Sequence, residues 1–226
     1  MPFRLWDLPT RLFHWLLVIL VILSSVSGLQ ESMTIHFYSG YAIFALLVFR
    51  LFWGLWGSTT ARFTAFIKGP RAILGYAATL FHRRPSRSLG HNPLGALSVL
   101  ALIGILGAQV GFGLFATDID FIDMGPLSDL VSFEAASASM DYHRFLFDII
   151  LILIGLHIAV ILFYRLYKRE NLVGPMLHGR IDLSDTPQHQ PKAKSLFFRG
   201  PLCAVLTLAL SVGLVWFTVK VLPKIL

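Results

Sequence analysis

Five long apolar segments, separated by polar stretches, make up most of the chain. They cover residues 12–29, 35–56, 93–116, 141–167 and 201–219. An α-helix needs roughly 20 apolar residues to cross a hydrocarbon core about 30 Å thick, and each segment is close to that length. The pattern predicts an all-α polytopic membrane protein whose first four segments form a four-helix bundle.

The polar stretches predict how the chain is divided. Residues 1–167 are expected to form the four-helix domain, residues 168–200 a basic, flexible linker, and residues 201–226 an additional transmembrane helix. The polar stretch at 57–90 contains the sequence FTAFIKGPRAILGYAATLF. This sequence favours one amphipathic helix lying in the membrane interface.

Composition narrows the class of protein further. The chain of 226 residues is 56% hydrophobic and 14% charged, which excludes a soluble domain of this size. The single cysteine, Cys203, excludes an intramolecular disulfide, and the chain contains no Cys-x-x-Cys-His signature for covalent c-type haem. The net charge of +7 does not indicate nucleic-acid binding, because the basic residues flank apolar segments.

Charge is distributed unevenly between the polar stretches, and this predicts the topology. Lysine and arginine collect at the amino terminus and in residues 57–90 and 165–199, whereas residues 117–140 carry five acidic residues and no lysine or arginine. The positive-inside rule therefore places the amino terminus in the cytoplasm and the acidic loop outside. Five spans then leave the carboxyl terminus outside as well.

Two histidines in the fourth segment carry the main chemical signal. His143 and His157 are fourteen residues apart, so on an α-helix they share one face and are separated by about 21 Å. Ionisable residues inside a membrane helix are rare and mark functional sites. One imidazole at each depth suggests one ligand for each of two haems; the alternative is that both histidines make polar contacts between helices.

Two further histidines lie at matching depths. His14 is at the cytoplasmic end of the first segment, level with His157, and His36 is at the external end of the second, level with His143. The four residues thus fall into two pairs, one pair near each membrane surface. Two imidazoles fill both axial positions of a haem iron, which suits electron transfer and leaves no open position for oxygen.

Three other residues near these levels have two or more interpretations. Arg50 either pairs with haem propionates or is a snorkelling arginine at a helix end. His91 ligates, contacts a propionate, contacts a quinone or is a capping or solvated interfacial histidine. Gly28, fourteen residues after His14, either leaves room for a haem ring or ends its helix.

Several stretches together resemble the bacterial cytochrome b561 family, which includes the b-type cytochrome subunits of nickel–iron hydrogenases. They are WDLPTRLFHW at 6–15, IHFYSGYAIFALLVFRLFWG at 35–54, GHNPLGALSVL at 90–100, GLFATDI at 113–119 and the His143/His157 pair. The resemblance implies two non-covalent haem b groups and electron exchange with quinone. It assigns His14 and His157 to one haem, and His36 and His143 to the other.

The predicted function is electron transfer between the membrane quinone pool and an external redox protein, such as a c-type cytochrome or a hydrogenase. The acidic loop at 117–140 either docks a basic c-type cytochrome or is simply solvated. Two alternatives remain. One is a superoxide:quinone oxidoreductase of the same family, an enzyme acting on quinone, and the other is a haem-free membrane anchor subunit.

Overall fold

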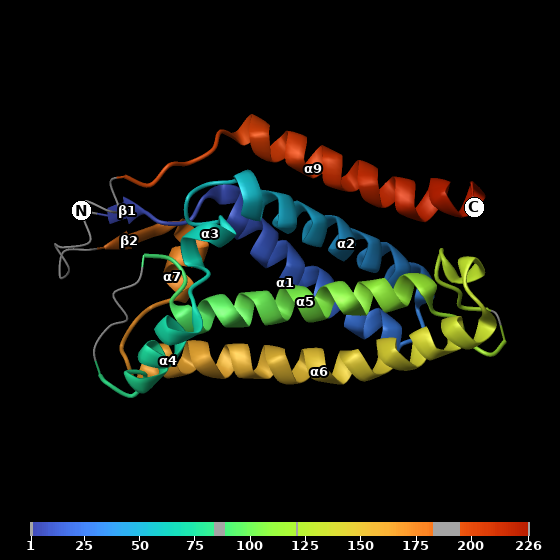
Figure 1. Cartoon of the computed structure of the whole chain (residues 1–226), viewed down its shortest axis with the longest axis horizontal. Helices are drawn as coiled ribbons and strands as arrows, with labels where there is room; N and C mark the ends of the chain where they lie inside the picture. The colour runs from blue at the N-terminus through green and yellow to red at the C-terminus, as the bar shows by residue number, and fades with distance from the viewer. Residues whose placement is uncertain (1, 84–88, 121, 183–194, 226) are drawn as a thin grey trace. The chain divides into compact units, whose positions relative to one another are not determined.

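The long apolar segments are helices. The computed structural model describes residues 2–83, 89–120, 122–182 and 195–225, and within them five helices are long and apolar enough to cross a membrane (Figure 1). These are α1 (Leu8–Leu29), α2 (Met33–Trp56), α5 (Pro93–Phe115), α6 (Phe133–Leu166) and α9 (Pro201–Trp216), the last continued by a π-helical turn (Phe217–Val221) and a 3-10 turn (Leu222–Lys224). The predicted membrane fold with an added carboxyl-terminal helix is confirmed.

Two helices begin earlier than the apolar pattern predicted, because polar side chains cap them. Asp7 precedes α1, and its Oδ1 accepts the backbone N–H of Thr10 at 2.9 Å. Ser132 precedes α6, and its Oγ accepts the N–H of Ala135 at 3.3 Å. A cap satisfies backbone donors of the first turn, so these helices start at 8 and 133 in place of the predicted 12 and 141.

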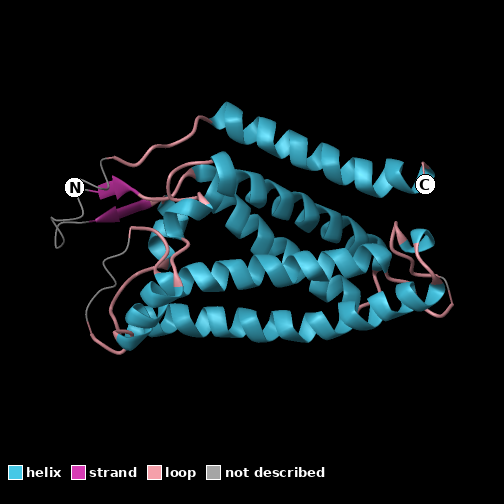
Figure 2. Cartoon of the chain, in the orientation of Figure 1, coloured by secondary structure: helices cyan, strands magenta, loops and turns pink. Residues whose placement is uncertain are grey.

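A small two-stranded sheet was not predicted. β1 (Pro2–Arg4) pairs antiparallel with β2 (Arg180–Asp182), and Phe3 lies opposite Ile181 (Figure 2). A short helix, α7 (Val173–His178), leads into β2 through Gly179. The described start of the predicted 168–200 linker therefore contains a short helix and a strand; residues 183–194, on which the prediction of flexibility was based, lie outside the described part. The three domain boundaries themselves stay a prediction.

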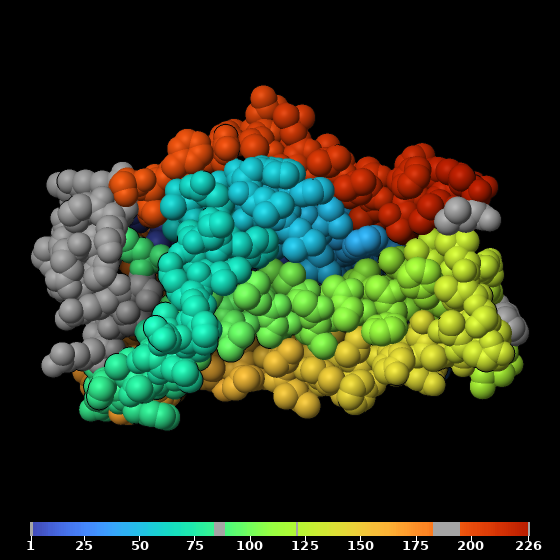
Figure 3. Space-filling view, in the orientation of Figure 1, coloured from blue at the N-terminus to red at the C-terminus, as the bar shows by residue number. Residues whose placement is uncertain are grey.

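The predicted interfacial helix is two short helices. α3 covers Phe63–Phe66 and α4 covers Pro70–Ala78. Ile67 is extended, and Pro70 cannot donate a backbone hydrogen bond to continue α3, so the helix stops and restarts. α4 buries none of its residues, and its atoms form part of the teal surface beside the start of α5 in Figure 3.

The chain forms two compact units, which are described separately. The first unit consists of Met1–His14, Arg50–Ala101 and Ile154–Ala204, and the second of Trp15–Phe49, Leu102–Leu153 and Val205–Leu226. In the first unit Asp7, Trp53 and Tyr164 are almost completely buried. In the second unit one hydrophobic cluster contains side chains from α2, α5, α9 and the loop after α5: Ala45, Leu114, Val215, Val219 and Leu127. The fifth helix thus packs into the core of the second unit.

Candidate functional site

His36 and His143 face each other in the second unit. His36 is on the first turn of α2 and His143 is on α6, and their ring centroids are 5.9 Å apart with the rings nearly perpendicular. Both side chains are half-buried. Two helices that are far apart in the chain therefore bring two of the predicted ligands together.

Each of these imidazoles is held by a backbone carbonyl of a neighbouring helix. Nδ1 of His36 is 2.9 Å from the oxygen of Ser24 on α1, and Nδ1 of His143 is 2.8 Å from the oxygen of Gln109 on α5. A carbonyl oxygen only accepts, so Nδ1 carries the hydrogen in both rings. Nε2 then has the free lone pair, which is the usual arrangement of a metal-binding histidine.

Glycines on α1 and α5 make these contacts possible. A Cβ built on Gly28 would come within 2.9 Å of Nδ1 of His36, and one on Gly113 within 2.9 Å of Cε1 of His143. Each glycine follows the accepting residue by four positions, so it lies one turn beyond the carbonyl and exposes it. Gly28 was expected to make room for a haem ring or to end its helix; it lies one residue before the end of α1, and the group against it is the His36 imidazole.

Gln109 is a contact that the sequence analysis missed. Its side-chain nitrogen is 3.2 Å from Nε2 of His143, and its Oε1 is buried without a hydrogen-bond partner. The lone pair that this amide contacts is the one an iron ion would use. A single glutamine inside the otherwise apolar α5 was the available sequence signal.

The other predicted site residues belong to the first unit. His14 is on α1, His157 on α6 and Arg50 on α2, and His91 lies two residues before α5. Burial, together with the nearby charges of Arg50, His14 and His157, lowers the pKa of His91 to about 3. His91 is therefore neutral at physiological pH, and these four side chains lie in one region of the unit.

His91 is enclosed by aromatic rings. Its centroid is 4.8 Å from that of Trp6 and 4.7 Å from that of Phe66, and its Nδ1 is buried without a hydrogen-bond partner. An ordinary solvated interfacial histidine would have water at that nitrogen. The enclosure favours the interpretations in which His91 serves a bound group.

Arg50 is buried, with 3% of its surface exposed. Its guanidinium carbon is 4.9 Å from the Phe63 ring centroid and 5.8 Å from that of Phe66. Among the described residues, Nη1 has no hydrogen-bond partner. This geometry excludes the snorkelling interpretation, because a snorkelling side chain keeps its charged end in water. A buried cation with an unused donor fits an anionic group such as a haem propionate.

A polar network beside His91 was also missed. The hydroxyls of Tyr76 and Tyr164 are 2.6 Å apart, and the side-chain amide of Asn92 donates to the Tyr164 hydroxyl at 3.0 Å. The Lys168 ammonium lies over both tyrosine rings, 5.7 and 5.1 Å from their centroids. Asn92 also accepts the N–H of Gly95 and so caps α5. The Asn-Pro sequence indicates the cap. No local sequence pattern indicates the contact with the tyrosines, which are distant in the chain.

The donor set suits haem better than a protein-only metal site. No group of three or more histidine, cysteine or acidic side chains is arranged to hold a metal within the described ranges. A haem iron takes four ligands from its macrocycle and needs only two from the protein. In the second unit, facing imidazoles with Nδ1 engaged suit the two protein ligands of a haem. In the first unit, a buried arginine with an unused donor suits a haem propionate.

A family model described as "Prokaryotic cytochrome b561" matches residues 5–179 of the chain. The chain belongs to the prokaryotic cytochrome b561 family. No curated protein and no solved structure matches it. As a member of the cytochrome b561 family, it is a membrane electron-transfer protein that carries haem b. The family match includes α7 and ends at Gly179, so α9 lies beyond it.

Proposed function

We propose that this cytochrome b561 binds two haem b groups and passes electrons between membrane quinone and a redox protein on the outer side. His36 and His143 hold one haem, and His14 and His157 hold the other. Bound haem b supplies a one-electron redox centre, and the protein supplies ligation, orientation and charge.

The orientation of the His36 and His143 rings is the observation that carries this proposal. Each Nδ1–H is engaged by a carbonyl, so each Nε2 carries a lone pair that can bind iron; at His143 the Gln109 amide contacts that lone pair and would have to move aside. Two imidazole ligands leave no open position on the metal, which favours electron transfer over oxygen activation. In the first unit, the two proposed ligands are His14 and His157. Both lie close enough to His91 to lower its pKa.

Arg50 and His91 have supporting roles in the proposal. The Nη1 donor of Arg50 binds a propionate of the haem in the first unit, compensating its negative charge. The neutral His91, with an unpartnered Nδ1 between Trp6 and Phe66, provides a hydrogen-bonding group for a quinone carbonyl. A planar quinone ring also suits an aromatic environment.

The acidic loop is the proposed docking surface for the external partner. Asp120 and Asp129 are exposed, as is Glu134 at the start of α6. Opposite charges speed the encounter of redox proteins, so the partner in this proposal is a basic c-type cytochrome. The positive-inside rule gives the accompanying orientation, with the amino terminus in the cytoplasm and the carboxyl terminus in the periplasm.

The proposal is tested by counting haem per polypeptide in purified wild type, His143→Ala and His82→Ala. His82 is an exposed histidine outside the proposed ligand sets and is the matched control. We expect two haems in the wild type and in His82→Ala, and one in His143→Ala, because a single imidazole does not hold haem b at a bis-histidine site. The reduced-minus-oxidised spectrum should lose about half of its α-band.

Other outcomes distinguish the alternatives. A colourless wild type, expressed with sufficient haem, would exclude the cytochrome function and leave the haem-free membrane anchor as the remaining function. Two haems in His143→Ala would show that this is a cytochrome with a different ligand set. Rapid, quinone-dependent consumption of superoxide by the purified protein alone would favour the superoxide:quinone oxidoreductase.

A further inference from the structure

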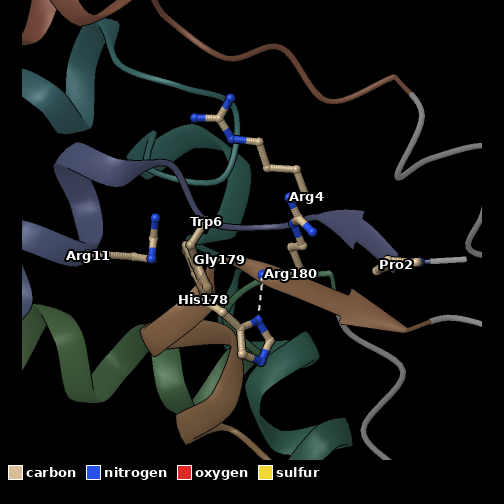
Figure 4. Close-up of a pocket in the computed structure, with 7 residues that line it drawn as sticks. All are labelled: Pro2, Arg4, Trp6, Arg11, His178, Gly179 and Arg180. Atoms are coloured by element: carbon tan, nitrogen blue, oxygen red, sulfur yellow. Dashed lines mark hydrogen bonds between the residues drawn. The ribbon is translucent and has the colours of Figure 1, made fainter.

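A basic cavity lies in the first unit, between the amino terminus and the segment that follows α7 (Figure 4). Its volume is about 580 Å³, and its seven lining residues include Arg4, Arg11, Arg180 and His178. None of the seven is acidic. The volume is in the range of small-molecule sites, and the charge favours an anionic ligand.

The cavity is built around Gly179. Its carbonyl accepts the N–H groups of Leu5 and Trp6, at 2.8 and 3.3 Å. Gly179 has a φ of 78°, and a Cβ there would come within 2.9 Å of the Trp6 oxygen and 3.1 Å of Arg11 Nε. Only glycine therefore allows β1, Trp6 and Arg11 to approach this turn so closely. The pocket is a feature of the folded backbone and not of loose surface side chains.

The arginine side chains that line the cavity carry only hydrogen-bond donors. Arg11 donates from Nη1 to the carbonyl of Leu177, and its Nε is buried without a partner. The backbone N–H of Arg180 donates to Nδ1 of His178 at 3.2 Å. With Nδ1 accepting, a neutral His178 carries its hydrogen on Nε2 and adds another donor. Arg4 also lines the cavity, and its guanidinium carbon lies 4.3 Å from the centroid of the Phe198 ring.

Exposed leucines lie close to Arg11, one of the residues that line the basic cavity. Leu8, Arg11 and Leu12 have the three- and four-residue spacings of one face of α1, and the two leucines are 50% and 51% exposed. Leu177, whose carbonyl contacts Arg11, is 59% exposed. A cluster of donors next to exposed apolar side chains matches a ligand with a charged head and hydrocarbon chains.

We propose that this cavity binds the phosphate group of an anionic phospholipid. The phosphate contacts Arg11 and Arg180, and the acyl chains lie along Leu8 and Leu12 of α1. Basic pockets at the ends of membrane helices bind anionic lipid headgroups, because their positive charge lies at the depth of the headgroups. The site would fix the amino terminus and the α7–β2 segment to one leaflet, and it does not depend on the haem ligand assignment.

The experiment is a native mass spectrometry titration of the full-length protein in detergent. The probes are phosphatidylglycerol, phosphatidylcholine and inorganic phosphate, and the variants are Arg180→Gln, Arg11→Gln and the double variant. Arg71→Gln is the matched control, because Arg71 is an exposed arginine of the same unit that does not line the cavity. Haem content is measured in every variant as the check on folding.

We expect saturable binding of one phosphatidylglycerol, with affinity reduced about tenfold in Arg180→Gln and further in the double variant, because each removes a charge-assisted hydrogen bond. Arg71→Gln should bind like the wild type. Equal affinity in all variants would overturn the site. If inorganic phosphate binds as tightly as phosphatidylglycerol, a lipid is not the occupant of the cavity. If Arg11→Gln loses haem, and so has not folded, the lipid affinity of Arg180→Gln still tests the site, because Arg180 is exposed.

Discussion

In this cytochrome b561, the position of each of two imidazoles depends on a glycine of the neighbouring helix. His36 and His143 both donate to a carbonyl located four residues before a glycine of the neighbouring helix. Any larger residue would cover that carbonyl and displace the ring. The repeated arrangement orients Nε2 of each histidine, and the loss of such a hydrogen bond to a metal-binding histidine typically lowers metal affinity about 10- to 100-fold.

Gly113→Ala tests this arrangement. Its Cβ would overlap the His143 ring, with contacts of 2.9 and 3.0 Å to Cε1 and Nδ1, so the ring must move and its carbonyl bond weaken. We expect the affinity for one of the two haems to fall about tenfold or more, measured by haem titration of the apoprotein. Gly111→Ala is the control, because a Cβ at Gly111 would meet nothing within 4 Å. Equal haem affinity in both variants would contradict the proposed role of Gly113.

At the scale of elements, polar caps determine where the membrane helices begin. Asp7 combines two roles, because its Oδ1 caps α1 while its Oδ2 accepts the indole N–H of Trp53 on α2 at 3.0 Å. Both Asp7 and Trp53 are fully buried. One carboxylate thereby joins the helix carrying His14 to the helix carrying Arg50.

Asp7→Ala should destabilise the protein more than removal of a simple cap. The loss of an N-cap costs roughly 1–2 kcal/mol, and the buried indole N–H of Trp53 would also lose its acceptor, at about 1–3 kcal/mol. The comparison is Ser132→Ala, an exposed cap of α6, which should cost less than about 1 kcal/mol. Unfolding in increasing denaturant, followed by tryptophan fluorescence, measures both. Similar values for the two variants would show that the Trp53 contact contributes nothing.

For the whole molecule, the fifth helix is a structural addition to a cytochrome b561 core. Thr207 and Ser211 are its buried polar residues, and Ser211 is completely buried. Small residues on a membrane helix allow close approach to its neighbours. In the first unit, the segment before α9 is held by Thr59, which exchanges hydrogen bonds with Phe197 at 3.0 to 3.2 Å. The proposed haem ligands are all on other helices.

A chain ending at Gly200 should therefore keep both haems and lose stability. Removal of α9 takes Val215 and Val219 out of the hydrophobic cluster with Ala45 and Leu114. We expect an unfolding temperature lower by about 5 °C or more, measured in detergent, with the haem content unchanged. Loss of one haem on truncation would instead give α9 a direct part in cofactor binding.

Much of the architecture followed from local patterns. Long apolar runs predict membrane helices because backbone groups in lipid must bond within their own segment. Helix starts were less accurate because a cap such as Asp7 lies outside the apolar run, although its spacing to Thr10 was visible. The β1–β2 pair had no usable signal, since it joins residues 2–4 to residues 180–182 across most of the chain.

The sequence alone determined the family and the five spans and predicted the histidines of the candidate site, because each depends on composition or on spacing within one helix. Tertiary structure decided what surrounds those histidines. It placed Gly28 and Gly113 against imidazoles, buried Arg50 among aromatic rings and brought Gln109 to His143. These are contacts between helices, and helical periodicity specifies which face a residue occupies but not which neighbouring helix that face meets.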